Sequence, residues 1–163
     1  MQYMKLSNSQ RQELMASLNE MSQYLEEAFS SLNPEQAQTS GTDGSFSPVE
    51  QVWHLTDLER EGFGVRIARL LSEANPQLPD FDGTAIALGR NYKSLSLFEG
   101  LLAFKEARQQ NITRLKTIET TEWTRSGTQE GIGNVSLCDI PSFMLQHDQA
   151  HIAEIEAWKT QVA

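Results

Sequence analysis

The sequence predicts an all-α protein, a four-helix bundle that forms a single domain over residues 1–163. Four long segments carry apolar side chains at alternating steps of three and four residues, which places those side chains on one stripe of a helix. Two of these segments begin with the spacing of a capping box, and no alternating strand pattern of comparable length appears. Long helices with links of moderate length favour an antiparallel bundle.

The first helix is expected over residues 6–32. Asn33–Pro34 ends it, because proline disfavours helical geometry in the residue before it. A polar stretch over residues 35–46 follows and is expected to be a loop. The apolar stripe of this helix consists of Leu14, Leu18, Met21, Leu25, Ala28 and Leu32.

The second helix has the strongest start signal in the chain. Ser47 can cap a free backbone N–H, Pro48 suits the first helical position, and Glu50 can reach back to the cap. The helix is expected to continue to Glu73, before Asn75–Pro76 closes it. Its inward side is predicted to carry Val52, Leu55, Leu58, Gly62, Val65 and Arg69.

The second half of the chain predicts two more long helices, over residues 94–118 and 136–161. Residues 77–83 are expected to be a loop, residues 84–92 a short helical piece, and residues 119–135 an irregular connection. Ser136 and Asp139 have capping-box spacing at the start of the last helix. Core candidates of the third helix are Phe98, Leu101, Leu102, Phe104, Ile112, Leu115 and Ile118.

The composition narrows the partners that the protein can bind. The formal net charge of -9 argues against nucleic acid and anionic membrane surfaces, which both require a cationic face. No apolar run approaches the roughly 20 residues that cross a bilayer, and the first residues lack the apolar stretch of a secretion signal. Cys138 is the only cysteine, so no internal disulfide can form. We expect a cytoplasmic protein with a small-molecule substrate.

The three histidines are the main candidates for chemistry. His147 and His151 lie four residues apart, so their rings share one helix face, within an apolar stripe. His54 lies at the border of the apolar side of the second helix. A buried imidazole costs free energy unless it finds a partner, and one divalent ion would serve all three rings. From the residues alone, ordinary hydrogen-bonded core histidines remain an equal alternative.

Two segments make the chain resemble the DinB/YfiT-like superfamily. Residues 47–60 are similar to its second-helix signature, and residues 144–155 are similar to its HxxxH fourth helix. Phe104, Arg108, Asn111 and Leu115 are similar to its third-helix pattern. The resemblance implies an up-down-down-up bundle with two long connections and a three-histidine metal centre, with His54, His147 and His151 on the ligand positions. Many relatives also have a histidine in the loop before the last helix, and residues 125–131 contain none.

The resemblance also implies a reaction class. The superfamily contains transferases and isomerases that use a low-molecular-weight thiol, so we expect a metal-dependent S-transferase acting on a small electrophile. A metal-dependent hydrolase and a non-enzymatic metal-containing binding or stress protein are the alternatives. Zinc or nickel is the expected ion, with iron or manganese next. A di-iron carboxylate centre is disfavoured, because no Glu-x-x-His motif is present.

Four further residues are weaker candidates for this site. Asp57, Glu61 or Glu154 could accept an N–H from an imidazole and orient it, although a solvated carboxylate is the simpler reading. Arg108 could hold an anionic group in the pocket or form an interhelical salt bridge.

The resemblance also suggests a homodimer. Phe63 and Leu97, both expected at the surface, would suit a contact between two copies.

Overall fold

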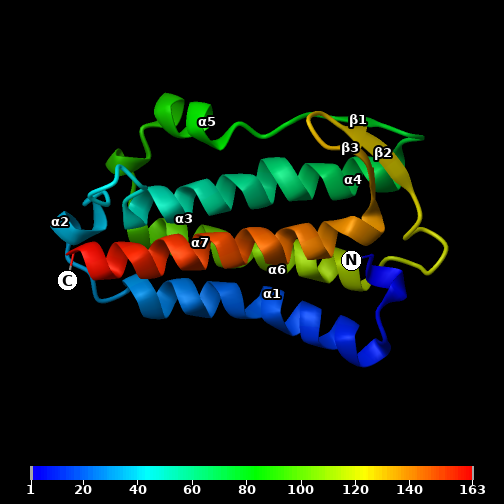
Figure 1. The fold of residues 1–163 in the computed structure, drawn as a ribbon, viewed down its shortest axis with the longest axis horizontal. Helices are drawn as coiled ribbons and strands as arrows, with labels where there is room; N and C mark the ends of the chain where they lie inside the picture. The colour runs from blue at the N-terminus through cyan, green and yellow to red at the C-terminus, as the bar shows by residue number, and fades with distance from the viewer. Residues whose placement is uncertain (1, 163) are drawn as a thin grey trace.

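Four long helices form the body of the computed structural model, which describes residues 2–162 (Figure 1). They are α1 (Asn8–Phe29), the continuous rod of α3 (Pro48–Asp57), η2 (Leu58–Phe63) and α4 (Gly64–Ser72), then α6 (Leu97–Lys116) and α7 (Ile140–Val162). The α3–α4 rod and α6 run in one direction, and α1 and α7 run in the other. The bundle is therefore up-down-down-up, and the predicted fold class is confirmed.

Short elements fill the connections. They are η1 (Tyr3–Lys5), α2 (Pro34–Ala37), β1 (Gln77–Leu78), α5 (Gly83–Arg90), η3 (Tyr92–Ser94), β2 (Ser126–Gln129), β3 (Gly133–Ser136) and η4 (Leu137–Asp139). The strands form one sheet of order β1-β2-β3, in which β1 is parallel to β2 and β2 is antiparallel to β3. The sequence predicted loops at these strands. Strands of two to four residues are too short to show an alternating pattern.

The predicted helix starts are confirmed by their hydrogen bonds. Ser47 N–H donates to Glu50 Oε1 at 3.1 Å, and Ser136 N–H donates to Asp139 Oδ2 at 2.8 Å. Both carboxylates thus satisfy a backbone donor that has no partner inside the helix. These two caps fix where α3 and η4–α7 begin, and these are the segments that carry the histidines.

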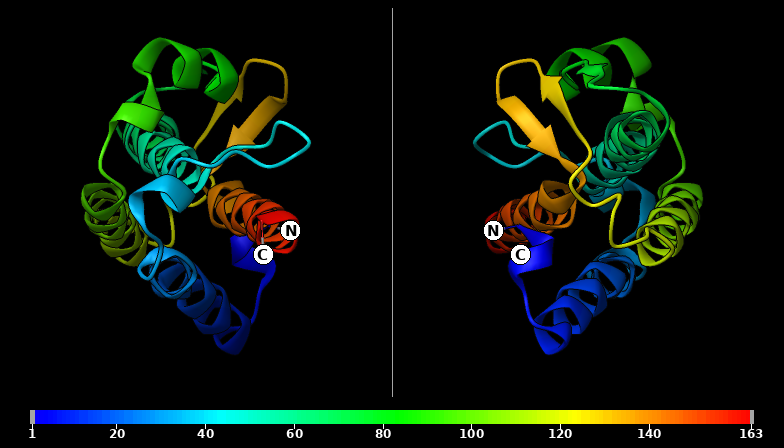
Figure 2. Two further views of the ribbon diagram at one scale, coloured as in Figure 1. Left: turned by 90° about the vertical axis from the view of Figure 1, so that its left-hand side faces the viewer. Right: turned by 90° about the vertical axis from the view of Figure 1, so that its right-hand side faces the viewer.

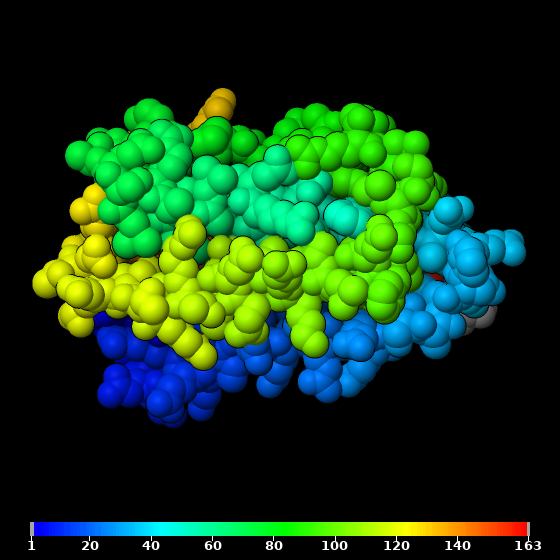
Figure 3. Space-filling view, turned by 180° about the vertical axis from the view of Figure 1, so that it is seen from behind, coloured from blue at the N-terminus to red at the C-terminus, as the bar shows by residue number. Residues whose placement is uncertain are grey.

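The helices pack around the bundle in the order α1, α6, α3, α7, as the end-on views show (Figure 2). The sheet and α5 lie over α3, α4 and α7. Seen from behind, α6 and its neighbours form a closed face, and α7 is almost wholly hidden (Figure 3). Helix α7 therefore lies on the opposite side of the molecule from this face.

The apolar core has two parts, one toward each end of the bundle. One part includes Ile67, Ile140 and Met144, and the other includes Leu55 and Phe104. The prediction that Phe98 and Leu102 belong to this core is wrong, because their side chains are 69% and 53% exposed. Both lie on the outward face of α6. None of the helices within residues 2–162 is long and apolar enough to cross a membrane.

The α3–α4 rod contains a π-helical turn, η2, which the sequence did not predict. Gly64 N–H bonds the carbonyl of Glu59, five residues earlier, and the Asn111 side chain donates to the same carbonyl at 3.0 Å. A Cβ on Gly64 would lie 2.8 Å from that oxygen, so the turn depends on glycine here. One residue is thereby inserted into the helical repeat.

The inserted residue rotates the rest of the helix. Arg66, Ile67 and Leu70 are buried in α4, whereas the sequence predicted Val65 and Arg69 on the inward side. Phe63, expected at the surface as a dimer contact, is only 4% exposed. The turn therefore brings two side chains, Phe63 and Arg66, into the interior beyond His54.

Candidate metal centre

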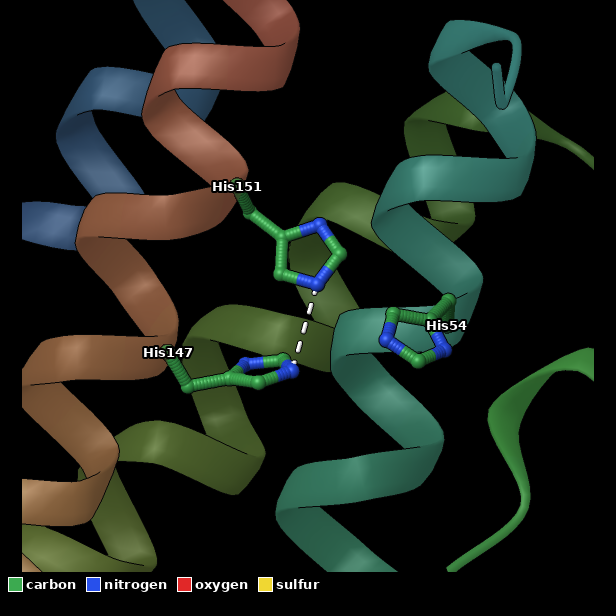
Figure 4. A group of neighbouring side chains, drawn as sticks. All are labelled: His54, His147 and His151. Carbon is green, nitrogen blue, oxygen red and sulfur yellow. Dashed lines mark hydrogen bonds between the residues drawn. The ribbon is translucent and has the colours of Figure 1, made fainter. Parts of the chain in front are cut away.

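The three histidine side chains converge between α3 and α7 (Figure 4). One ligand nitrogen from each ring can be chosen such that all three lie within 4.8 Å of one another. The Nε2 atoms of His147 and His151 are 3.2 Å apart. Imidazoles from two separate helices thus meet at one point inside the bundle.

The fold explains this convergence. His147 and His151 are separated by one turn of α7 and project from the same face. His54 lies in the last turn of α3, across from them. The three imidazoles therefore fill the space between α3 and α7 near His54.

A side-chain relay fixes the orientation of His151. Its Nδ1 lies 2.7 Å from Gln51 Oε1, and Gln51 Nε2 donates to Glu154 Oε2 at 2.9 Å. Because the amide nitrogen is committed to Glu154, the amide oxygen must accept the Nδ1–H of His151. The Nε2 of His151 consequently presents a lone pair toward His147 and His54. Hydrogen bonds from His151 and Gln51 lower the pKa of Glu154 to about 2, so this relay keeps its charge.

The other two imidazoles are neutral at physiological pH. Burial, followed by the proximity of His151, lowers the pKa of His54 to about 4 and that of His147 to about 3. The Nδ1 atom of His54 is buried and has no hydrogen-bond partner among the described residues. Neutral imidazole is the form that binds a metal ion.

The donor set suits a divalent metal ion. A tetrahedral ion with metal–nitrogen distances of about 2.05 Å places its nitrogens roughly 3.3 Å apart. The 3.2 Å between His147 and His151 already matches this spacing. His54, within 4.8 Å, would need only a small approach, and its unpartnered Nδ1 shows that the ring is not held by a competing hydrogen bond.

Aromatic rings and a glycine enclose the site. The ring centroids of Phe46 and Phe81 lie 5.5 and 6.1 Å from that of His54, and Phe63 lies 6.1 Å from His147. A Cβ on Gly83 would lie 2.5 Å from His54 Cε1, so only glycine allows the chain to pass this closely. The apolar wall limits access of water, and His54 and His151 are 8% and 7% exposed.

Comparison with known proteins identifies the family. A family model described as the DinB superfamily matches residues 17–155. The chain belongs to the DinB superfamily. Among solved structures, YfiT from Bacillus subtilis superposes with a TM-score of 0.87, at 20% sequence identity, over 97% of this chain and 90% of that one. YfiT is described as a probable metal-dependent hydrolase with an unusual four-helix bundle topology. No curated protein matches the chain.

Among the weaker candidates in this DinB-superfamily chain, Glu154 lies beside the histidines. Its Oε2 is 3.3 Å from Nδ1 of His151. The same oxygen accepts a hydrogen bond from Gln51 Nε2 and so fixes the Gln51 amide. Asp57 and Glu61 instead bind Arg90, at 2.7 Å and 2.9 Å, and Asp57 also accepts the hydroxyl of Tyr92 at 2.6 Å. The structure therefore shows neither of these two carboxylates hydrogen-bonded to His54.

Arg108 lies in the core, where it bridges helices. Its guanidinium donates to Asp148 on α7 at 2.7 and 2.8 Å and to Glu59 in η2 at 2.6 Å. Of the two roles considered from the sequence, the interhelical salt bridge is the one in the structure. Cys138, at 4% exposure, is buried in η4.

Gln51 is the site residue that the sequence analysis missed. It lies three residues before His54, which places both side chains on one face of α3. A polar side chain that shares a helix face with a candidate ligand was the available signal. The Gln51 side chain is 2% exposed and forms two hydrogen bonds to residues of α7. It therefore holds the imidazole of His151 in position.

Replacing Gln51 with methionine should weaken metal binding. The change keeps the volume of the side chain but removes the acceptor that fixes the tautomer of His151. Loss of such a support typically costs about 10–100-fold in metal affinity. Competition with a chromophoric chelator would measure the change, beside the control Gln149→Met on the exposed face of α7. Equal affinities for the two variants would contradict the assigned role.

Proposed function

We propose that this protein is a metal-dependent hydrolase whose divalent ion is held by His54, His147 and His151. The observation that carries the proposal is the convergence of three imidazoles, with every ligand supplied by a ring nitrogen. Three protein ligands leave a coordination position open, as in catalytic sites, whereas structural zinc sites are usually closed by four. Zinc or nickel suits this donor set best, with iron or manganese next.

A divalent ion in this position supplies Lewis acidity, which lowers the pKa of a bound water or thiol toward neutrality. Nearby residues orient the candidate ligands for that chemistry. Gln51 holds His151 in the tautomer with a free Nε2, and Glu154 anchors Gln51. Phe46, Phe63 and Phe81 lie beside the histidines, and these apolar rings lower the local dielectric, which strengthens electrostatic interactions in the site.

Hydrolysis now ranks above the thiol S-transfer that the sequence favoured. YfiT, which shares the fold, is described as a probable metal-dependent hydrolase.

The test compares three preparations: zinc-loaded wild type, chelator-treated wild type and zinc-treated His54→Ala. Each is given activated esters, aryl amides and phosphoesters with water as the nucleophile. We expect hydrolysis of at least one class by the zinc-loaded wild type only. Equal rates in all three preparations would refute the metal-dependent hydrolase.

A parallel panel distinguishes the alternatives. Epoxides and chlorinated electrophiles are offered with and without a small thiol. Thiol-dependent turnover without hydrolysis would replace the hydrolase with the S-transferase. Stoichiometric metal with no turnover in either panel would favour the non-enzymatic metal-containing protein.

A further inference from the structure

Arg66 is a largely buried arginine for which the described residues provide no counterion. Its side chain is 7% exposed, and its Nε is sealed from solvent. Within residues 2–162 this Nε has no hydrogen-bond partner, whereas the two terminal nitrogens of the guanidinium are not sealed from solvent. Arg108, the other deeply buried arginine, shows the usual arrangement, with two carboxylates and a backbone carbonyl around it.

The surroundings of Arg66 offer only weak compensation. Its guanidinium carbon lies 5.6 Å from the ring centroid of Phe63, a cation–π contact. Burial lowers the pKa of Arg66, and Asp80 partly offsets this from a distance. A sealed N–H without an acceptor costs free energy, and the absence of a counterion means that no ion pair offsets this cost. An arginine that contributes little to folding in this position is a candidate for binding a ligand.

Arg66 lies next to the metal centre. The ring of Phe63 contacts both the guanidinium of Arg66 and, at 6.1 Å between centroids, the imidazole of His147. The segment that includes Asp80 also carries Phe81, whose ring lies 6.1 Å from that of His54. One aromatic ring thus separates the unpartnered cation from the histidines, and the same loop borders both.

The strand layer beside this loop holds a second unsatisfied polar atom. Gln129, on β2, is 4% exposed, and its Oε1 accepts no hydrogen bond from any described residue. Gln129 pairs in register with Leu78 on β1, two residues before Asp80. The free groups are therefore a donor on Arg66, which suits a carboxylate, and an acceptor on Gln129, which would suit an N–H or O–H elsewhere on a ligand.

We propose that Arg66 binds the carboxylate of the substrate and directs the reacting part of that molecule toward the histidines. This inference rests on the proposed function and names its substrate class, a small molecule with one carboxylate. The planar guanidinium matches a carboxylate through two parallel hydrogen bonds. A single cation near Asp80, in a protein of net charge -9, disfavours phosphate-rich ligands.

The test measures binding rather than turnover, so it does not depend on the reaction. Butyrate and hexanoate are titrated into wild type, Arg66→Met and Arg66→Lys, each in zinc-loaded and chelator-treated form, with NMR shifts as the readout. Hexanamide is the neutral control ligand. Arg60→Met is the control variant, because Arg60 is exposed and its loss changes the net charge equally.

We expect hexanoate to bind wild type with or without zinc. Its affinity should fall at least tenfold in Arg66→Met, in both forms, with part of it retained in Arg66→Lys and all of it in Arg60→Met. Hexanamide should not distinguish the variants. Failure of hexanoate to bind wild type, or equal binding to Arg66→Met, would overturn the proposal.

Thermal unfolding provides the second readout. Removing an unpartnered buried charge should leave the Tm of Arg66→Met unchanged or raise it. A clearly lower Tm with unchanged hexanoate binding would assign Arg66 a purely structural role. If zinc-loaded protein hydrolyses nothing but hexanoate still binds through Arg66, the proposed function fails while the carboxylate site stands. Loss of hexanoate binding only on chelation would instead place the carboxylate on the metal and refute the role of Arg66.

Discussion

His147→Ala is expected to abolish stoichiometric metal binding while leaving the bundle folded. The wild type, supplied with zinc, should retain one equivalent after desalting. The variant keeps two imidazoles, too few to hold the ion against buffer. The loss should exceed the roughly 10–100-fold that removing a supporting hydrogen bond costs. Elemental analysis after desalting measures the metal, and circular dichroism measures the helix content.

The variant should fold because the imidazole of His147 contributes little to the core. Its Nε2 lies 3.2 Å from Nε2 of His151, which is within hydrogen-bond distance. Gln146→Ala, one residue earlier on the exposed side of α7, is the matched control and should bind zinc normally. Zinc should also raise the Tm of wild type and of Gln146→Ala but not that of His147→Ala, because a ligand stabilises the state that binds it. Stoichiometric zinc in His147→Ala would show that the histidines are not the metal site.

The long helices were predictable because their signals are local. The capping pairs Ser47–Glu50 and Ser136–Asp139 each lie within one turn, and apolar stripes need only the 3.6-residue repeat. The sheet was not predictable in this way. Strands as short as β1 and β2 depend on backbone pairing with distant segments, such as Gln77 with Thr128, and leave no pattern in their own sequence.

The largest error came from one inserted residue. The sequence gives no local sign of the π turn in η2, which depends on tertiary contacts such as the bond from the Asn111 side chain to the Glu59 carbonyl. A helix without this turn would place Phe63 at the surface and would not direct Arg66 inward. Phe98 and Leu102 were misplaced for another reason, since apolar residues occur on more than one face of α6 and the stripe was ambiguous.

The candidate site was predictable in part. The i,i+4 spacing of His147 and His151 follows from the sequence alone, and the family resemblance added His54. Hydrogen bonds across helices could not be assigned in advance. Gln51 reaches His151 across from α3, and Glu154 reaches it from the next turn of α7. Asp57 and Glu61 pair with Arg90 instead, a residue whose position the sequence alone did not indicate.

Removing the guanidinium of Arg108 should have the largest effect on stability of any change considered. Arg108 is 2% exposed and forms ion pairs with Glu59 and Asp148. Both carboxylates are buried and lie on the two helical rods that carry the histidines. Arg108→Met keeps the apolar volume but leaves two buried carboxylates without a cation. Breaking a buried ion pair in this way costs about 3–5 kcal/mol. Urea unfolding of the metal-free protein would measure the loss.

Two further variants separate the charge effect from a packing effect. Arg69→Met removes an exposed salt bridge to Glu73 and a hydrogen bond to the Gln77 carbonyl, and should cost much less than Arg108→Met because water can replace both. Adding Glu59→Gln and Asp148→Asn to Arg108→Met removes the uncompensated charges and should restore much of the lost stability, since replacing a whole buried ionic cluster is often close to neutral. If the triple variant is no more stable than Arg108→Met, the loss of stability arises from packing and not from the unpaired carboxylates.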